Sequence, residues 1–195
     1  LVPIVTREDY CREMMGLSLR NVTLTVRKAG KKKPVFSELG EMLFTHFGVS
    51  GPLVLSASSH MTGDLGEYSM EIDLKPGLTV QQLDARLLRD FEKFINKDFS
   101  NALDELLPRK LIPVAVRLSG IAPDTKVNQI TREEREKLIS VIKAFPVTPV
   151  RFRPVEEAIV TSGGVKVSEV DPHTMESRLV PGLYFIGEVL DLDAY

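Results

Sequence analysis

Hydrophobic and polar residues alternate in the first part of the chain as they do in half-buried strands. Residues 17–27, LSLRNVTLTVR, place hydrophobic residues on one face and polar residues, mainly threonine, on the other. A turn at Ala29–Gly30 and the segment PVFSELGEMLF follow, which predicts a β-hairpin. The segment from Tyr68 to Leu74 repeats the same two-residue period. Residues 1–77 are therefore predicted to be mainly β-structure.

The hydrophobic period changes from two residues to three or four after Pro76–Gly77. Two capping-box patterns, Thr79 with Gln82 and Thr131 with Glu134, each precede apolar residues at helical spacing. Each pattern lets a threonine hydroxyl and a glutamine or glutamate side chain satisfy backbone N–H groups at the start of a helix. Both sites are therefore predicted to begin amphipathic helices.

Shorter helical signals lie between these two helices. Ser100 is expected to cap a short helix that runs to Leu107, and Pro108 to stand in the first turn of the next one. Residues 78–145 are thus expected to form a helical unit of three or four helices. Residues 146–160 then return to extended chain, so the helical unit interrupts a β region. The predicted fold class is α+β, with the helices as an insertion.

Composition places the chain among ordinary globular proteins. It has 195 residues, 43% hydrophobic and 27% charged, with a formal net charge of −2. This charge argues against a dedicated nucleic-acid-binding protein, so no nucleic-acid partner is expected. The cations from Arg27 to Lys33 could bind phosphate, but a solvated hairpin tip is favoured. The single cysteine, Cys11, forms no internal disulfide, which fits a cytoplasmic protein.

The residue types also argue against a membrane protein and a metal-binding protein. A long stretch without charged residues, residues 43–63, contains too many histidine, serine, threonine and glycine residues for a membrane span. Three well-separated histidines and one cysteine provide no metal-ligand spacing. Neither a membrane nor a metal is therefore expected as a partner.

The segment LFTHFGVSGP, Leu43 to Pro52, combines small polar residues with two glycines. Ser50 is expected to cap the helix that follows, leaving backbone N–H groups free to attract negative charge. Thr45 and His46 precede this helix start. The alternative is a strand–turn–helix corner in which the glycines only permit a positive φ and His46 is merely hydrogen-bonded.

Two more segments contain glycine where backbone could approach a ligand. Gly163 and Gly164 follow a predicted strand, and without a Cβ they permit close contact, although such pairs also form ordinary tight turns. Residues 183–188 are predicted to form a strand that ends in Gly187–Glu188. A carboxylate there could accept hydrogen bonds from sugar hydroxyls, with Asp191 as a further acceptor.

These segments together resemble a known family. LFTHFGVSGP and the later TSGGVKVSEVDPHTMESRLVPGLYFIGEVLDLD are similar to the YhiN/BaiN-type bacterial flavoproteins, which are NAD(P)/FAD-dependent, aminoacetone oxidase-like oxidoreductases. LVPIV, GLSLRNVTL and the helical segment share the resemblance, which covers nearly the whole chain. It implies a small β-barrel-like domain with an inserted helical subdomain, followed by a partial segment of a Rossmann-like FAD domain.

The resemblance divides the chain into four parts. Residues 1–77 would be the first part of the barrel, 78–145 the helical insert, 146–160 the barrel return and 161–195 the FAD-domain segment. The chain would thus be an excised insert with part of the FAD domain attached. Because no glycine-rich dinucleotide fingerprint is present, FAD is expected in the whole protein and not in this chain alone.

The resemblance also implies roles for individual residues. The positions that would lie near the flavin are Thr161, Gly163, Gly164, Gly187, Glu188 and Asp191. The barrel would cover the flavin, which makes Thr45, His46 and Ser50 substrate-side candidates, while no catalytic acid is identified. The implied chemistry is hydride transfer from NAD(P)H to the flavin and onward to a small electrophilic substrate.

Other partners follow from the same comparison. In the whole protein, the FAD-binding domain would cover residues 183–186. Without that domain, the apolar side chains of these residues should be partly exposed or mediate self-association. The alternative function is a non-enzymatic module of barrel and helices that binds a protein or RNA. The glycine–glutamate end of the predicted strand has no explanation in that alternative.

Overall fold

One antiparallel sheet organises the β part of the computed structural model, which describes residues 1–160 and 163–192. Its strands in chain order are β1 (Ile4–Thr6), β2 (Ser18–Lys28), β3 (Phe36–Phe44), β4 (Gly48–Ser50), β5 (Tyr68–Asp73), β6 (Phe145–Val147) and β7 (Pro149–Phe152). The hairpin of β2 and β3 is confirmed, as is the strand that begins at Tyr68.

The two edge strands of this open sheet are consecutive in the chain. The strand order is β6-β5-β2-β3-β4-β1-β7, so β6 and β7 stand at opposite edges. Only Thr148 separates them in sequence, and residues 145–152 therefore form one extended segment. Its first half pairs with β5 and its second half with β1, both antiparallel. The sheet thus has the connectivity of a small barrel, and both β portions belong to one sheet, as predicted.

The alternation seen in the sequence determines which strand faces are buried. Val22, Leu24 and Val26 of β2 are at most 2% exposed, and Leu24 pairs with Ile72 of β5. Helix α2 (Pro52–Ser59) packs against β3, and the short helix α1 (Tyr10–Glu13) lies beside β4. Burial of these apolar side chains is the main stabilising contribution to the barrel.

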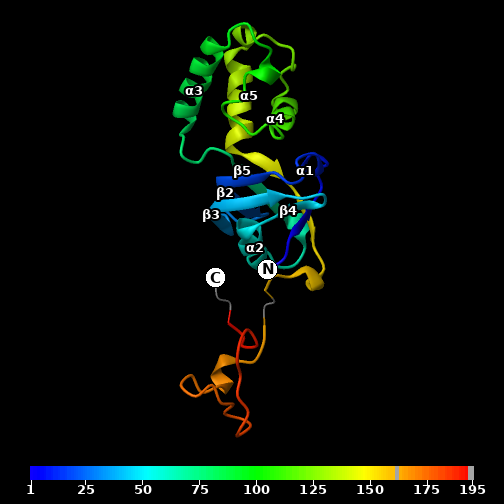
Figure 1. The fold of residues 1–195 in the computed structure, drawn as a ribbon, viewed down its shortest axis with the longest axis vertical. Helices are drawn as coiled ribbons and strands as arrows, with labels where there is room; N and C mark the ends of the chain where they lie inside the picture. Colours follow the sequence, from blue (N-terminus) through cyan, green and yellow to red (C-terminus); the bar gives the residue numbers. More distant parts are fainter. Residues whose placement is uncertain (161–162, 193–195) are drawn as a thin grey trace.

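Three helices form a lobe at one end of the barrel (Figure 1). They are α3 (Val80–Lys93), α4 (Ile112–Ser119) and α5 (Arg132–Lys143), with α5 between the other two. Both capping boxes are confirmed: the Gln82 N–H donates to Thr79 Oγ1 at 3.2 Å, and the same geometry recurs at Thr131. The apolar faces of α3 and α5 meet in the core of this lobe.

The helix predicted from Ser100 to Leu107 is wrong. Only a 3₁₀ turn, Phe99–Asn101, forms there, and the following residues make turns up to α4. The backbone N–H groups of Phe99 and Ser100 donate instead to the carbonyl oxygens of Thr125 and Pro123. These long-range hydrogen bonds replace the ones that a helix would make. Pro113, not Pro108, occupies the first turn of the next helix.

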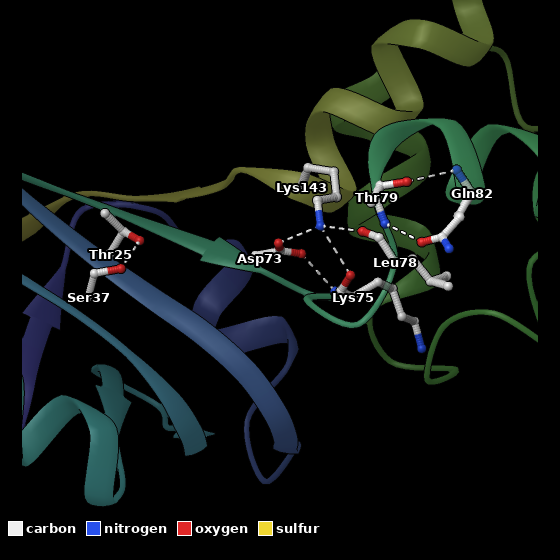
Figure 2. A network of polar contacts seen from close by, with 8 residues as sticks. All are labelled: Thr25, Ser37, Asp73, Lys75, Leu78, Thr79, Gln82 and Lys143. Carbon is white, nitrogen blue, oxygen red and sulfur yellow. Dashed lines mark hydrogen bonds and ion pairs between the residues drawn. The ribbon is translucent and has the colours of Figure 1, made fainter.

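Lys143 joins the helical lobe to the barrel, as Figure 2 shows. Its Nζ pairs with the Asp73 carboxylate at 2.5 Å and donates to the carbonyl oxygens of Lys75 and Leu78 at 3.1 and 2.8 Å. Asp73 ends β5, residues 75–78 lead to α3, and Lys143 ends α5. One ammonium group therefore holds together both chain segments that connect the lobe to the barrel.

The C-terminal segment, residues 163–192, leaves the barrel at the end opposite the helical lobe (Figure 1). Within its described residues it contains the 3₁₀ turn Val167–Glu169 and isolated β-bridges. The strand predicted for residues 183–188 is not formed. Tyr184 makes a single bridge to Glu176, and no continuous strand pairing follows it within the described residues. Leu183, Tyr184 and Ile186 are 43%, 57% and 86% exposed, as expected for a segment without sheet neighbours.

Candidate functional site

The segment LFTHFGVSGP forms a tight turn between β3 and β4. The Thr45 N–H donates to the Gly48 carbonyl at 2.8 Å, and Thr45 Oγ1 accepts from the Gly48 N–H at 3.1 Å. His46 lies exposed at the tip of this turn. The hydrogen bonds of Thr45 therefore close the turn, and the imidazole of His46 lies at the surface.

The expected capping role of Ser50 is wrong. Ser50 belongs to β4 and pairs with Leu43, while Gly51 occupies the N-cap position of α2 without a side-chain hydrogen bond. Because the helix begins at Pro52, Ser50 lies one residue too early to cap it. Ser50 remains half-buried beside the turn.

Close backbone contacts explain the two glycines of this segment. A Cβ on Gly48 would lie 2.4 Å from the Ile4 carbonyl oxygen, and one on Gly51 would lie 3.0 Å from Met42 Cα. Both residues also have positive φ angles, 151° and 94°. The glycines are thus required by the packing of β1 and β3 against this segment, which is the structural alternative considered above.

Aromatic and charged side chains surround His46. Its ring contacts Phe47 edge-on, with the centroids 5.0 Å apart, and the Arg153 guanidinium lies 4.6 Å from the Phe47 ring centroid. Arg153 donates hydrogen bonds to Glu157, and these hold the pKa of the Glu157 carboxyl below its usual value. His46 therefore belongs to a polar surface cluster with Phe47, Arg153 and Glu157.

This cluster lies where the chain enters and leaves the barrel. The Arg153 N–H donates to the Pro3 carbonyl at 3.0 Å, and the Ile159 N–H donates to the Leu1 carbonyl at 3.1 Å. Residues 1–3 and 153–160 are thus side by side. Residue 160 thus lies at the same end of the barrel as His46.

The second and third glycine-containing segments come together in the C-terminal part. The Val165 N–H donates to the Val189 carbonyl, and the Asp191 N–H donates to the Val165 carbonyl, both at 2.9 Å. A Cβ on Gly164 would lie 2.4 Å from the Val189 carbonyl oxygen, whereas one on Gly163 would meet nothing within 4 Å. Gly164 therefore serves the contact between the segments, and Gly163 leaves its backbone open to a ligand.

The remaining cofactor candidates surround this contact. Gly187 has a φ of 75°, which favours glycine, and Glu188 and Asp191 are exposed next to the paired segment. Thr161 lies outside the described residues. No hydrogen bond between described residues joins the 45–50 segment to residues 163–192. The structure therefore brings together the flavin-side candidates, but it does not join them to the substrate-side ones.

Other polar and titratable groups were not predicted as site residues. Burial raises the pKa of the Cys11 thiol to about 11, so this cysteine is neutral and unreactive at neutral pH.

The helical lobe contains an open cavity of about 620 Å³ beside α4, lined by Arg109, Val116 and Arg117 among others. Only folding brings these residues together, and the sequence gives no spacing signal for them.

No group of three or more histidine, cysteine, aspartate or glutamate side chains within residues 1–160 and 163–192 could hold a metal ion. Across the same ranges, no helix is both long and apolar enough to cross a membrane.

Comparisons with known proteins give relatives for the entire chain. It is 34% identical over 195 residues to the ribosomal RNA dihydrouridine synthase of Escherichia coli and 35% identical to that of Haemophilus influenzae. It is 31% identical over 159 residues, 80% of the chain, to the 3-dehydro-bile acid delta(4,6)-reductase of Clostridium scindens. The chain spans 46% of the length of each synthase and 39% of the reductase.

A family profile matches the larger part of the chain. Residues 1–160 match the HI0933-like protein barrel and H2TH domain, and these residues contain both the seven-stranded sheet and the helical lobe. The chain therefore belongs to the HI0933-like family, the YhiN/BaiN-type flavoproteins that its glycine-containing segments resemble.

Proposed function

We propose that this chain is the substrate-side part of a flavin-dependent reductase that acts on uridine in RNA. The observation that carries the proposal is the match to two ribosomal RNA dihydrouridine synthases over the whole chain. The match to the bile-acid reductase is shorter and slightly weaker. The expectation that no nucleic acid is bound came from the net charge alone, and we replace it here with RNA as the substrate class.

The names of both kinds of relative describe one chemistry. Dihydrouridine is uridine with one carbon–carbon double bond reduced, and a delta(4,6)-reductase also reduces carbon–carbon double bonds. In each case the double bond is conjugated to a carbonyl group, so it accepts a hydride at one carbon and a proton at the other. FAD would serve as the two-electron carrier: NAD(P)H would reduce it, and the reduced flavin would deliver a hydride to the substrate.

The C-terminal part has features that fit contact with a flavin. Gly163 has a positive φ and open space where a Cβ would be, so a planar ring could approach its backbone. Glu188 and Asp191 are exposed carboxylates next to the paired segments, and they could accept hydrogen bonds from ribityl hydroxyls. A pyrophosphate site would have to come from elsewhere in the protein, because this chain has no glycine-rich fingerprint.

The barrel is suited to insertion into a flavin domain. Its first and last segments pair side by side, so a host domain could continue from both without distortion. His46 lies at that same end with Phe47 and Arg153. In the whole protein, the turn at residues 45–47 would cover the substrate above the flavin, with Thr45 holding the turn closed.

A second candidate function is reduction of a small conjugated ketone, favoured by the likeness to the bile-acid reductase. The whole protein should be purified and assayed for NAD(P)H oxidation with an RNA transcript and, separately, with a steroid enone. The proposal predicts a yellow protein whose NAD(P)H oxidation depends on RNA. A yellow protein that responds only to the enone would establish the second candidate. A colourless protein that no added FAD activates would leave a non-enzymatic binding module.

A further inference from the structure

One face of α3 carries a row of cations. Arg86, Arg89 and Lys93 recur at the three- and four-residue spacing that places side chains on one helix face. Lys97 continues the row in the turn that follows the helix. These four residues are termed the α3 basic face.

Two cations of this face, Lys93 and Lys97, lie over one aromatic ring, and Lys93 also pairs with a carboxylate. The Nζ atoms of Lys93 and Lys97 lie 5.0 and 4.1 Å from the centroid of the Phe94 ring. Lys93 pairs with Glu105 at 2.6 Å, and Arg86 Nη2 donates to the Glu105 carbonyl at 3.4 Å. The hydrogen bond from Lys93, with the fields of Lys93, Arg86 and Lys97, holds the Glu105 pKa below its usual value. The basic face therefore concentrates positive charge over a short distance.

Neighbouring carboxylates neutralise this charge only in part. Asp90 pairs with Arg86 at 2.8 Å and Glu105 pairs with Lys93, whereas Arg89 and Lys97 have no carboxylate partner among the described residues. A fifth cation, Lys75, adjoins the face, and its side chain points away from Lys143 (Figure 2). Burial and the nearby Arg86 lower the Lys75 pKa. Positive charge is therefore in local excess although the chain as a whole is slightly acidic.

A hollow opens at the start of the same face. Its volume is about 310 Å³, near the lower end of the range for small-ligand clefts, and Leu78, Ala85, Arg86 and Arg89 contribute to its lining. Gln82 also lines it, and Gln82 Oε1 already accepts from the Thr79 N–H at 2.9 Å. The Gln82 amide therefore has its NH₂ group left to donate. The hollow offers apolar walls, an amide donor and two guanidinium groups.

We propose that the α3 basic face and its hollow bind an unpaired segment of RNA, with phosphates on the cations and one base in the hollow. This rests on the proposed function, since it identifies where the RNA substrate is held outside the reaction centre. Guanidinium groups bind phosphate oxygens in a bidentate manner, and apolar or aromatic surfaces accept base faces of any sequence. An acidic protein segment would use the cations, but it would not need a hollow with an amide donor.

The test measures binding of a fluorescently labelled, unstructured RNA oligonucleotide to the 195-residue chain at several salt concentrations. The variant Arg89→Ala/Lys97→Ala removes two cations that make no ion pair, so the fold should be retained. Loss of two phosphate contacts should reduce the slope of log K against log salt by roughly 1.4. At about 0.1 M salt this corresponds to binding weaker by roughly 25-fold.

Two further variants test whether the loss of RNA affinity is specific to the charge of the α3 basic face. Arg132→Ala/Lys137→Ala removes the same charge from α5, where Arg132 pairs with Glu136 and Lys137 lies in a separate groove beside α4. This control should bind RNA like the wild type. Arg89→Lys/Lys97→Arg keeps the charge of the face and should also retain most of the binding. Circular dichroism melting curves should be the same for all variants.

The proposal is overturned if the wild-type chain does not bind RNA, or if the α3 and α5 double variants lose affinity equally. Binding that acidic polyglutamate displaces as readily as RNA would also overturn it, in favour of a protein partner. These results do not depend on flavin content. A colourless whole protein would therefore refute the reductase proposal while leaving the RNA measurement to be judged separately.

Discussion

Replacing Lys143 with methionine removes the ammonium group that joins the helical lobe to the barrel and keeps most of the aliphatic stem. The group makes one ion pair with Asp73 and two hydrogen bonds to backbone carbonyls, and both charged side chains are only about 20% exposed. Hydrogen bonds to charged groups contribute about 1.5–3 kcal/mol each. Water can replace part of this at a partly exposed site, so the expected loss is about 2–3 kcal/mol.

Thermal unfolding followed by circular dichroism measures this loss. For a chain of this size, 2–3 kcal/mol corresponds to a melting temperature lower by roughly 5–10 °C. Lys137→Met is the matched control on the same helix, and its side chain is exposed, so it should change stability by less than about 0.5 kcal/mol. Asp73→Asn tests the pair itself: combined with Lys143→Met, it should destabilise less than the sum of the single changes. Equal melting temperatures for the Lys143 and Lys137 variants would refute the reasoning.

Three other perturbations follow from the structure. Gly48→Ala should destabilise the protein by about 3 kcal/mol or more in urea unfolding, because the new Cβ would lie 2.4 Å from the Ile4 carbonyl oxygen. Gly30→Ala, at a φ of 78° with open space, should cost only about 1–2 kcal/mol, and equal losses would contradict this account. His46→Ala in the whole protein should lower turnover at least tenfold, about 1.4 kcal/mol, without changing the melting temperature. A matching loss of stability would instead assign His46 a structural role. Burial raises the Cys11 pKa from 9.0 to about 11, so the neutral thiol is favoured in the folded state. Its contribution to stability is complete below pH 9 and is lost as the pH rises through about 11, so unfolding free energy should fall more steeply there than in Cys11→Ala. Parallel pH profiles would show that the thiol is not involved.

Local sequence patterns predicted the elements whose stabilising contacts are local. The threonines at positions 79 and 131 and their partners three residues later define helix starts within four residues. Val22, Leu24 and Val26 alternate because β2 buries one face on the core. In both cases the spacing of residues in the chain already contains the geometry.

Long-range contacts decided the elements that the sequence predicted wrongly. Ser100 does not begin a helix because residues 99 and 100 hydrogen-bond to residues 123 and 125. Residues 183–188 have β-forming side chains, but a strand needs paired neighbours, and within the described chain they have a single bridge. The pairing of residues 145–152 with both β5 and β1 and the α3 basic face likewise depend on residues that only folding brings together.

The dihydrouridine content of ribosomal RNA tests the central proposal most directly. Nucleosides should be measured by mass spectrometry in the organism that makes this protein, with its gene intact, deleted and restored. The account predicts that deletion removes dihydrouridine from ribosomal RNA, that the wild-type gene restores it, and that the His46→Ala gene restores it poorly. Unchanged dihydrouridine in the deletion strain would contradict the assignment of RNA uridine as the substrate.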